Sequence, residues 1–115
     1  MYDTKMYKEM VLYIEACESG SMFDKTLKDD INVYAVTAAN AHESSWGTYC
    51  PPQDKVRGKS LRTCLGDLFS VNWMENADAY EPDSETLDGQ FDIVKKLTTK
   101  SHVLRFGDTT TTMVD

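Results

Sequence analysis

A short run of apolar residues near the start of the chain, residues 10–14, sets the strongest limit on its fold. The run Met-Val-Leu-Tyr-Ile leads into Glu15, Ala16 and Cys17, after which small and polar residues follow. A nearly continuous apolar run of this length, bounded by turn residues, predicts a strand that is buried in a parallel sheet. Ligands of open α/β sheets bind just beyond the carboxyl ends of such strands, so Cys17 has the position of a functional residue.

Strand geometry adds a carboxylate to this thiol. Successive side chains of a strand point to opposite faces, so a strand continued to Cys17 would direct Tyr13, Glu15 and Cys17 to the same side. An acid beside a thiol at a strand end is a candidate site. The alternative is that Glu15 is a solvated residue at the strand end and that Cys17 is a small buried hydrophobe.

Three further strands are predicted along the chain. Residues 31–37 are rich in β-branched and aromatic side chains and form the parallel neighbour of the first strand. Residues 65–74 alternate apolar and polar side chains, with Phe69, Val71 and Trp73 on one face, which predicts a third strand. An edge strand is expected around Val103, Leu104 and Phe106.

Helices are predicted on either side of these strands. Residues 3–9 have the pattern of the end of a helix that leads into the first strand. Residues 84–98 form a second helix with Asp83 as its N-cap, and its apolar stripe is core-facing: Leu87, Phe91, Val94 and Leu97. Between the strands and this helix, residues 75–82 are acidic and are expected to be a solvated linker.

Composition limits the classes of partner. The chain has 115 residues with 41% hydrophobic residues, which suffices for the core of one small domain. A formal net charge of −7 argues against nucleic-acid binding, which needs a basic face. No apolar run approaches the roughly 20 residues of a membrane span, so no membrane partner is expected. Nothing in the sequence requires a cofactor or a metal.

The segment from Glu15 to Met22 resembles the nucleophile segment of the legumains, the asparaginyl endopeptidases of the clan that also contains the caspases. Further blocks match in the same order, at residues 31–40, 43–45, 65–67, 70–75 and 101–103. The resemblance extends from about Lys5 to Asp108, and several ordered blocks are more specific than one motif. It implies an α/β, partial caspase-like fold with a mostly parallel sheet flanked by helices, in which residues 1–115 are the C-terminal part of the catalytic domain.

The resemblance also implies roles for individual residues. Cys17 would be the nucleophile, and its backbone N–H would contribute to the oxyanion site. Glu15, Ser44, Ser45 and Asp67 would form the pocket that binds the substrate asparagine of a peptide or protein. Two carboxylates can accept hydrogen bonds from the asparagine amide, and an aspartate would fit only when a carboxyl is protonated. Judged from the residues alone, Ser44 and Ser45 could equally be a turn or capping cluster.

The other two cysteines, Cys50 and Cys64, bracket a polar loop rich in Pro, Gly and Lys, which is expected to be exposed. By resemblance to vacuolar members of the family, they form a disulfide. Zinc binding is the competing interpretation, although two cysteines 14 residues apart in a chain with two histidines give poor zinc spacing. A pair plus one free thiol, Cys17, fits a lysosomal or vacuolar enzyme.

The general base is not evident in the sequence. The family's catalytic histidine lies in a His-Gly pair upstream of the nucleophile strand, and the only histidines here are His42 and His102. We therefore expect a fragment truncated at both ends, without the histidine-bearing half and the C-terminal prodomain, and inactive by itself. The first residues also have no signal peptide. A central strand that lacks a neighbour would leave an exposed sheet edge, through which the isolated chain is expected to self-associate.

Three functions remain open at this point. The first is a cysteine endopeptidase that cleaves after asparagine, or after aspartate at acidic pH, in vacuolar or lysosomal protein processing. The second is a catalytically dead fragment that acts only as a fold core or interaction domain. The third, a glycolipid-anchor transamidase of the same clan, fits the segment from Glu15 to Ser21 and the Ser44-Ser45 pair less well.

Overall fold

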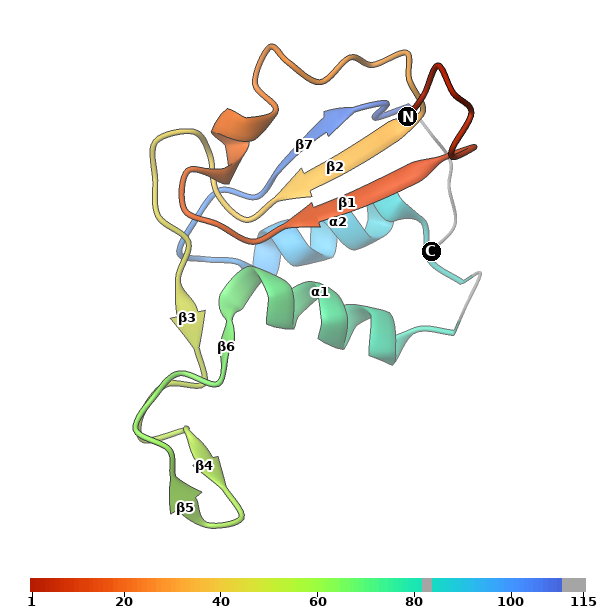
Figure 1. Cartoon of the computed structure of the whole chain (residues 1–115). Coiled ribbons are helices and arrows are strands. Elements are labelled where there is room, and N and C mark those ends of the chain that lie inside the picture. Colours follow the sequence, from red (N-terminus) through yellow and green to blue (C-terminus); the bar gives the residue numbers. More distant parts are fainter. Residues whose placement is uncertain (82–83, 111–115) are drawn as a thin grey trace.

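A computed structural model describes residues 1–81 and 84–110, whose central element is a three-stranded sheet (Figure 1). The strands are β1 (Met10–Ile14), β2 (Val33–Thr37) and β7 (Leu104–Gly107), in the order β1-β2-β7. Two helices, α1 (Leu68–Ala79) and α2 (Leu87–Leu97), lie together on one face of this sheet.

Smaller elements extend away from this sheet. Strands β3 (Gly47–Thr48) and β6 (Gly66–Asp67) pair antiparallel, and beyond them β4 (Lys55–Val56) and β5 (Lys59–Ser60) form a hairpin at the far end of the molecule (Figure 1). A 3₁₀ helix, η1 (Ser19–Met22), follows β1.

The first two predicted strands are confirmed as parallel neighbours. Met10 of β1 pairs with Val33 of β2, and the register continues to Ile14 opposite Thr37. The predicted edge strand is also present, but β7 runs antiparallel to β2. One of the two pairings is therefore parallel and the other is not, so the expectation of a mostly parallel sheet is not confirmed, whereas the α/β, partial caspase-like fold is.

The hydrophobic core lies between the sheet and the two helices. Tyr34 and Val36 of β2 are two residues apart and so face the same way, toward Phe69 of α1 and Phe91 and Val94 of α2. All five side chains are buried, and burial of each such apolar side chain contributes about 1.5–3 kcal/mol. At the sheet edge, Tyr13 of β1 stacks on Trp73 of α1 with 4.4 Å between ring centroids.

The opposite face of the sheet is covered by the segment that follows Cys17. The N–H of Gly20 donates to the Ala39 carbonyl at 2.9 Å, and a Cβ at Gly20 would lie 3.0 Å from the Asn40 carbonyl carbon. Glycine at position 20 therefore permits this close backbone approach. The hydroxyl of the neighbouring Ser19 accepts a hydrogen bond from the Ala39 N–H at 3.0 Å.

The predicted third strand is wrong. Only Gly66–Asp67 are strand, and helix α1 begins at Leu68. The alternation that suggested a strand contains Phe69 and Trp73, which are four residues apart and therefore also share one face of a helix. Continuing the helix to Ala79 places Asn76 in a buried position, so residues 75–79 are not part of a solvated linker.

The predictions for the other helical segments are corrected in part. Residues 3–9 form turns rather than a helix; the Tyr7 hydroxyl donates to the Ile31 carbonyl at 2.7 Å, and Lys5 has a φ of 53°. Helix α2 is confirmed but begins at Leu87 with Thr86 as N-cap, whose hydroxyl accepts from the Gly89 N–H at 3.1 Å. The predicted cap, Asp83, lies outside the described residues.

The predicted stripe of α2 is confirmed at Leu87, Phe91 and Val94, whereas Leu97 is half exposed.

Strand β1 lies at one edge of the sheet and pairs only with β2 within the described residues. Self-association through this edge stays a prediction. Across residues 1–81 and 84–110, no helix is both long and apolar enough to cross a membrane.

Candidate active site

Cys17 is the free thiol of the chain and is exposed to solvent. Strand β1 ends at Ile14, so Cys17 lies three residues beyond the carboxyl end of the strand, in the turn that leads into η1. Its Sγ is 3.8 Å from the carbonyl oxygen of Ser45, a contact in which the thiol donates. The thiol is thus accessible and lies beside the loop between β2 and β3.

That loop is held in place by Glu43. One carboxylate oxygen accepts the N–H groups of Asn40 at 2.8 Å and His102 at 2.7 Å. The other lies 2.8 Å from His102 Nδ1. Burial would raise the pKa of Glu43, but the hydrogen bonds from Asn40 and His102 outweigh it, so this pKa lies below its usual value.

Glu43 also contacts the nucleophile segment through its backbone. Its carbonyl accepts the Glu18 N–H at 2.7 Å, and Glu18 takes a φ of 52° that non-glycine residues rarely adopt. Ser44 and Ser45 follow Glu43 directly, and Ser44 is exposed whereas Ser45 is partly buried. One residue therefore fixes the relative position of the Cys17 turn and the two serines.

Glu15 points toward the amino end of α1 rather than toward Cys17. Its Oε2 accepts both the backbone N–H and the hydroxyl of Ser70, each at 3.0 Å. A carboxylate in this position satisfies a free N–H of the first helical turn and is favoured by the helix dipole. Its second oxygen, Oε1, is buried and has no hydrogen-bond partner among the described residues.

Asp67 lies at the same end of α1, in the N-cap position. Its side chain makes no capping hydrogen bond, and the residue is exposed. Its backbone pairs with Gly47, and the next N–H, of Leu68, donates to the Trp46 carbonyl at 2.8 Å. Asp67 is thereby tied to the segment that follows Ser45, while Glu15 occupies the capping role that Asp67 leaves open.

These contacts bring the predicted site residues to one end of the sheet. Cys17 contacts Ser45, the chain continues from Ser45 to Gly47, and Gly47 pairs with Asp67, which precedes the helix turn that binds Glu15. The shared direction predicted for the alternating side chains holds for Tyr13 and Glu15, which both reach the helices, but Cys17 lies beyond the strand and faces the β2–β3 loop.

Neither histidine contacts the thiol among the contacts of the described residues. His42 is exposed, and its backbone N–H donates to the Asn40 side chain at 2.9 Å. The ring of His102 is bound to Glu43. A group of three or more His, Cys, Asp or Glu side chains suited to a metal ion is not found within residues 1–81 and 84–110.

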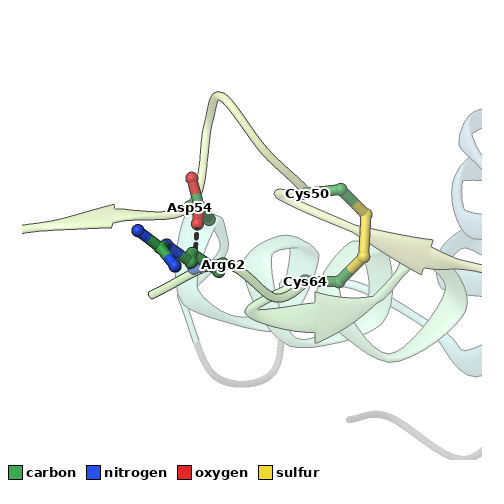
Figure 2. Close-up of a disulfide and its surroundings, with 4 residues drawn as sticks. All are labelled: Cys50, Asp54, Arg62 and Cys64. Atoms are coloured by element: carbon green, nitrogen blue, oxygen red, sulfur yellow. Dashed lines mark hydrogen bonds between the residues drawn. A yellow bond between two sulfur atoms is a disulfide. The ribbon is translucent and has the colours of Figure 1, made fainter. Parts of the chain in front are cut away.

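The disulfide between Cys50 and Cys64 is confirmed and lies at the base of the β4–β5 hairpin (Figure 2). Inside the loop, the carboxylate of Asp54 accepts the Ser60 hydroxyl at 2.6 Å and the Arg62 N–H at 2.5 Å. The hydrogen bond from Ser60 is the main reason that the Asp54 pKa is lowered; burial opposes it, and backbone N–H groups such as that of Arg62 add to the lowering.

Two positioning residues were not predicted from the sequence, Glu43 and Ser70. Both lie within blocks that the family resemblance matched, but no local pattern distinguishes them from solvated loop or strand residues. Their partners, His102 and Glu15, are 59 and 55 residues away in the chain. Only a three-dimensional arrangement reveals such pairs.

The fold is an α/β domain with an exposed thiol beyond the carboxyl end of a parallel strand, and two acids, Glu15 and Asp67, lie at the amino end of α1. The sequence matches the model of the Peptidase C13 family over residues 1–114. The chain therefore belongs to the Peptidase C13 family.

Individual relatives agree with this assignment. The chain is 49% identical over 112 residues to the vacuolar-processing enzyme delta-isozyme of Arabidopsis thaliana, covering 93% of this chain and 24% of that protein. It is 47% identical over 113 residues to legumain of Canavalia ensiformis, covering 92% of this chain and 24% of that protein. The chain thus spans about a quarter of the length of these relatives.

Proposed function

We propose that this chain carries the nucleophile and part of the specificity pocket of a cysteine endopeptidase that cleaves peptide bonds after asparagine. Its family membership and its identity to a legumain and to vacuolar-processing enzymes support this class of reaction. The free, exposed thiol of Cys17 beyond the carboxyl end of β1 supplies a nucleophile in the position that such chemistry requires.

The reaction proceeds through a covalent thioacyl intermediate. The general base takes the thiol proton, and the Cys17 sulfur bonds to the backbone carbonyl carbon of the asparagine while the Cys17 N–H donates to the developing oxyanion. The peptide C–N bond then breaks, and the amine leaves with that proton from the general base. Water then attacks the thioester, releasing the new carboxyl group and restoring the thiol. The base in this proposal is a histidine outside these 115 residues, because His102 is bound to Glu43.

The observation that supports the specificity is that two acids, Glu15 and Asp67, lie at the amino end of α1, and that Asp67 is exposed and makes no capping hydrogen bond with its side chain. Glu15 is held there by Ser70, which donates to its Oε2. The amide of an asparagine side chain provides two N–H donors for such carboxylates. Asp67, with Ser44 and Ser45 on the facing loop, completes the pocket in this proposal.

The same pocket predicts an effect of pH on specificity. An aspartate carboxylate would be repelled by Glu15 and Asp67, whereas a protonated carboxyl can donate to one of them. Cleavage after aspartate should therefore rise relative to cleavage after asparagine as the pH falls. Processing of proteins in an acidic vacuole or lysosome is the setting we propose, in keeping with the names of the relatives.

The test is hydrolysis of a fluorogenic Ala-Ala-Asn substrate at about pH 5.5, where carboxylates with ordinary pKa values stay ionised, by a longer polypeptide that contains this chain together with the histidine-bearing segment. Turnover that disappears in Cys17→Ala would support the proposal, whereas turnover by the purified 115-residue chain alone would contradict the assignment of the base to a histidine outside it. Within an active preparation, Glu15→Gln and Asp67→Asn should each lower kcat/KM for asparagine about tenfold or more. Glu18→Gln, an exposed acid next to the nucleophile, is the matched control and should retain activity.

A second candidate is a fold core or interaction domain without catalysis. The observation that favours it is that neither His42 nor His102 contacts the thiol within the described residues. The absence of turnover in the folded longer polypeptide that supplies the histidine would support this candidate.

A further inference from the structure

The segment of residues 50–64, here called the basic arm, differs in charge from the rest of the chain. It contains four of the twelve Lys and Arg residues but one of the nineteen Asp and Glu residues. The arm therefore carries a formal charge of +3, whereas the remaining residues carry −10. Its one acid, Asp54, is buried and hydrogen-bonded to Ser60 and Arg62, so its carboxylate is not exposed at the surface.

All four cations of the basic arm are exposed: Lys55, Arg57, Lys59 and Arg62. Within residues 1–81 and 84–110, the structure gives none of them an ion-pair partner, since the ion pairs found join His102 to Glu43 and Arg105 to Asp88. Arg62 contributes its backbone N–H to Asp54, which leaves its guanidinium available. The charge is thus unneutralised.

The basic arm is also constrained in shape. The disulfide closes its base, Asp54 crosslinks its two sides, and the chain reverses at Arg57 and Gly58, whose φ angles of 49° and 80° suit a tight hairpin turn. Apart from Asp54, every residue from Pro51 to Leu65 is exposed. The arm projects away from the sheet and helices and presents its cations on a preorganised element (Figure 1).

The basic arm joins the domain beside Asp67, one of the candidate site residues. The arm leaves the domain through β3 and β6, whose pairing joins Gly47 to Asp67. Tyr49, which directly precedes the arm, donates a hydrogen bond from its hydroxyl to Glu75 of α1. The pairing of β3 with β6 thus connects the basic arm to Asp67, and an extended polypeptide that runs from Cys17 past Asp67 would continue toward the arm.

We propose that the basic arm binds acidic stretches of polypeptide substrates and so selects cleavage positions that have Asp and Glu residues nearby. Opposite charge on an exposed, rigid element raises both the encounter rate and the affinity for an acidic segment. A nucleic acid is disfavoured as the partner because the surrounding body is strongly acidic. This inference rests on the proposed function only in taking the partner to be a substrate.

The test uses binding rather than catalysis, so that it stays separate from the test of the proposed function. The whole chain with Cys17→Ala is titrated into fluorescein-labelled hexaglutamate and, in parallel, hexaglutamine, with anisotropy as the readout. We expect binding of hexaglutamate alone, weakening at least about tenfold as the salt rises from about 50 mM to about 200 mM.

Two variants of equal net charge locate the binding surface. The arm variant carries Lys55→Glu, Arg57→Glu and Lys59→Glu, which leave the disulfide, Asp54 and Ser60 unchanged. The body variant carries the same change at Lys8, Lys28 and Lys100, which are exposed and lie outside the arm. We expect the arm variant to lose at least about tenfold in affinity and the body variant to change about twofold. Lys55→Gln with Lys59→Gln, which preserves the turn residue Arg57, should weaken binding in the same direction.

Several results would overturn the proposal. These are no binding of hexaglutamate at low salt, equal losses in the arm and body variants, or tighter binding of a labelled oligothymidylate than of hexaglutamate. Sedimentation velocity provides a further result that would overturn it. If the wild type binds no peptide but self-associates, and the arm variant does not self-associate, then the arm binds the acidic body of a second copy instead.

Discussion

The body of the molecule and the basic arm are stabilised by different interactions. In the body, apolar side chains from β2, α1 and α2 pack into one core. In the arm, every residue from Pro51 to Leu65 except Asp54 is exposed. The disulfide and the hydrogen bonds of the Asp54 carboxylate stabilise the arm in place of a core. A segment with no core can hold a defined shape when covalent and polar crosslinks replace burial. Four measurements can break or sharpen this contrast.

The largest effect is expected from the core of the body. Phe69→Ala removes a ring that is 1% exposed and lies between the sheet and α2, which should lower the free energy of unfolding by about 3–5 kcal/mol. The matched control in the arm is Leu61→Ala, which removes a side chain that is 53% exposed and should change stability by less than about 0.5 kcal/mol. Urea denaturation followed by circular dichroism measures both, and a similar loss in the two variants would contradict the contrast.

The next effect concerns the disulfide. Replacing Cys50 and Cys64 by Ser should lower the free energy of opening of the arm by up to about 3 kcal/mol, the value expected for a loop of about 15 residues. The reason is local, so hydrogen exchange should accelerate at arm amides such as that of Arg62, while amides of β2 stay protected. Hydrogen exchange read by mass spectrometry distinguishes the regions, and equal acceleration in β2 would show that the arm and the body unfold together.

A third test uses pH, because each region depends on one carboxylate with a lowered pKa. For Asp54 in the arm and Glu43 in the body, the hydrogen-bonded state is fully favoured above the pKa of the unfolded chain and is lost as the pH falls through the lower, folded pKa. Lowering the pH from about 6 to about 2 should therefore release the Arg62 and His102 amides.

The variants for this pH test are Asp54→Asn and Glu43→Gln, which keep an acceptor but remove the charge. Asp54→Asn should expose the Arg62 amide at neutral pH without affecting the His102 amide, and Glu43→Gln should do the reverse. Hydrogen exchange of the Arg62 and His102 amides, measured by NMR, checks this. If either variant accelerated exchange at both amides, the assignment of one carboxylate to each region would be wrong.

The smallest effect is expected at the candidate nucleophile. Cys17 is exposed and its side chain contacts only the Ser45 carbonyl among the contacts described, so Cys17→Ala should change the free energy of unfolding by less than about 0.5 kcal/mol. The same denaturation assay checks this. A loss above about 1 kcal/mol would show that the thiol has a structural role.

Sequence patterns predicted the elements whose local signal agreed with their final environment. The apolar run of residues 10–14, the β-branched run before Thr37 and the stripe of Leu87, Phe91 and Val94 all became the elements they predicted. The free thiol beyond a strand end was likewise visible in the sequence, because residue type and position along the chain suffice to find it.

Sequence patterns misled where two periods overlapped or where distant partners decided the outcome. Phe69 and Trp73 satisfy both the strand and the helix period, and packing of α1 against α2 and the sheet selected the helix. The turns of residues 3–9 replaced a predicted helix because Tyr7 and Asn32 bind across to other segments. Short helices have little stability of their own, so such contacts prevail.

By itself, then, the sequence determined the family, the parallel β1–β2 pair, the candidate nucleophile Cys17 and the charge contrast between residues 50–64 and the rest. The tertiary structure alone decided that β7 runs antiparallel to β2, that Glu15 caps α1 while its second oxygen stays unsatisfied, and that Glu43 joins the nucleophile turn to His102. The physical reason is that strand pairing, capping and carboxylate hydrogen bonds link residues dozens of positions apart, and local residue patterns carry no record of which distant partner is reached.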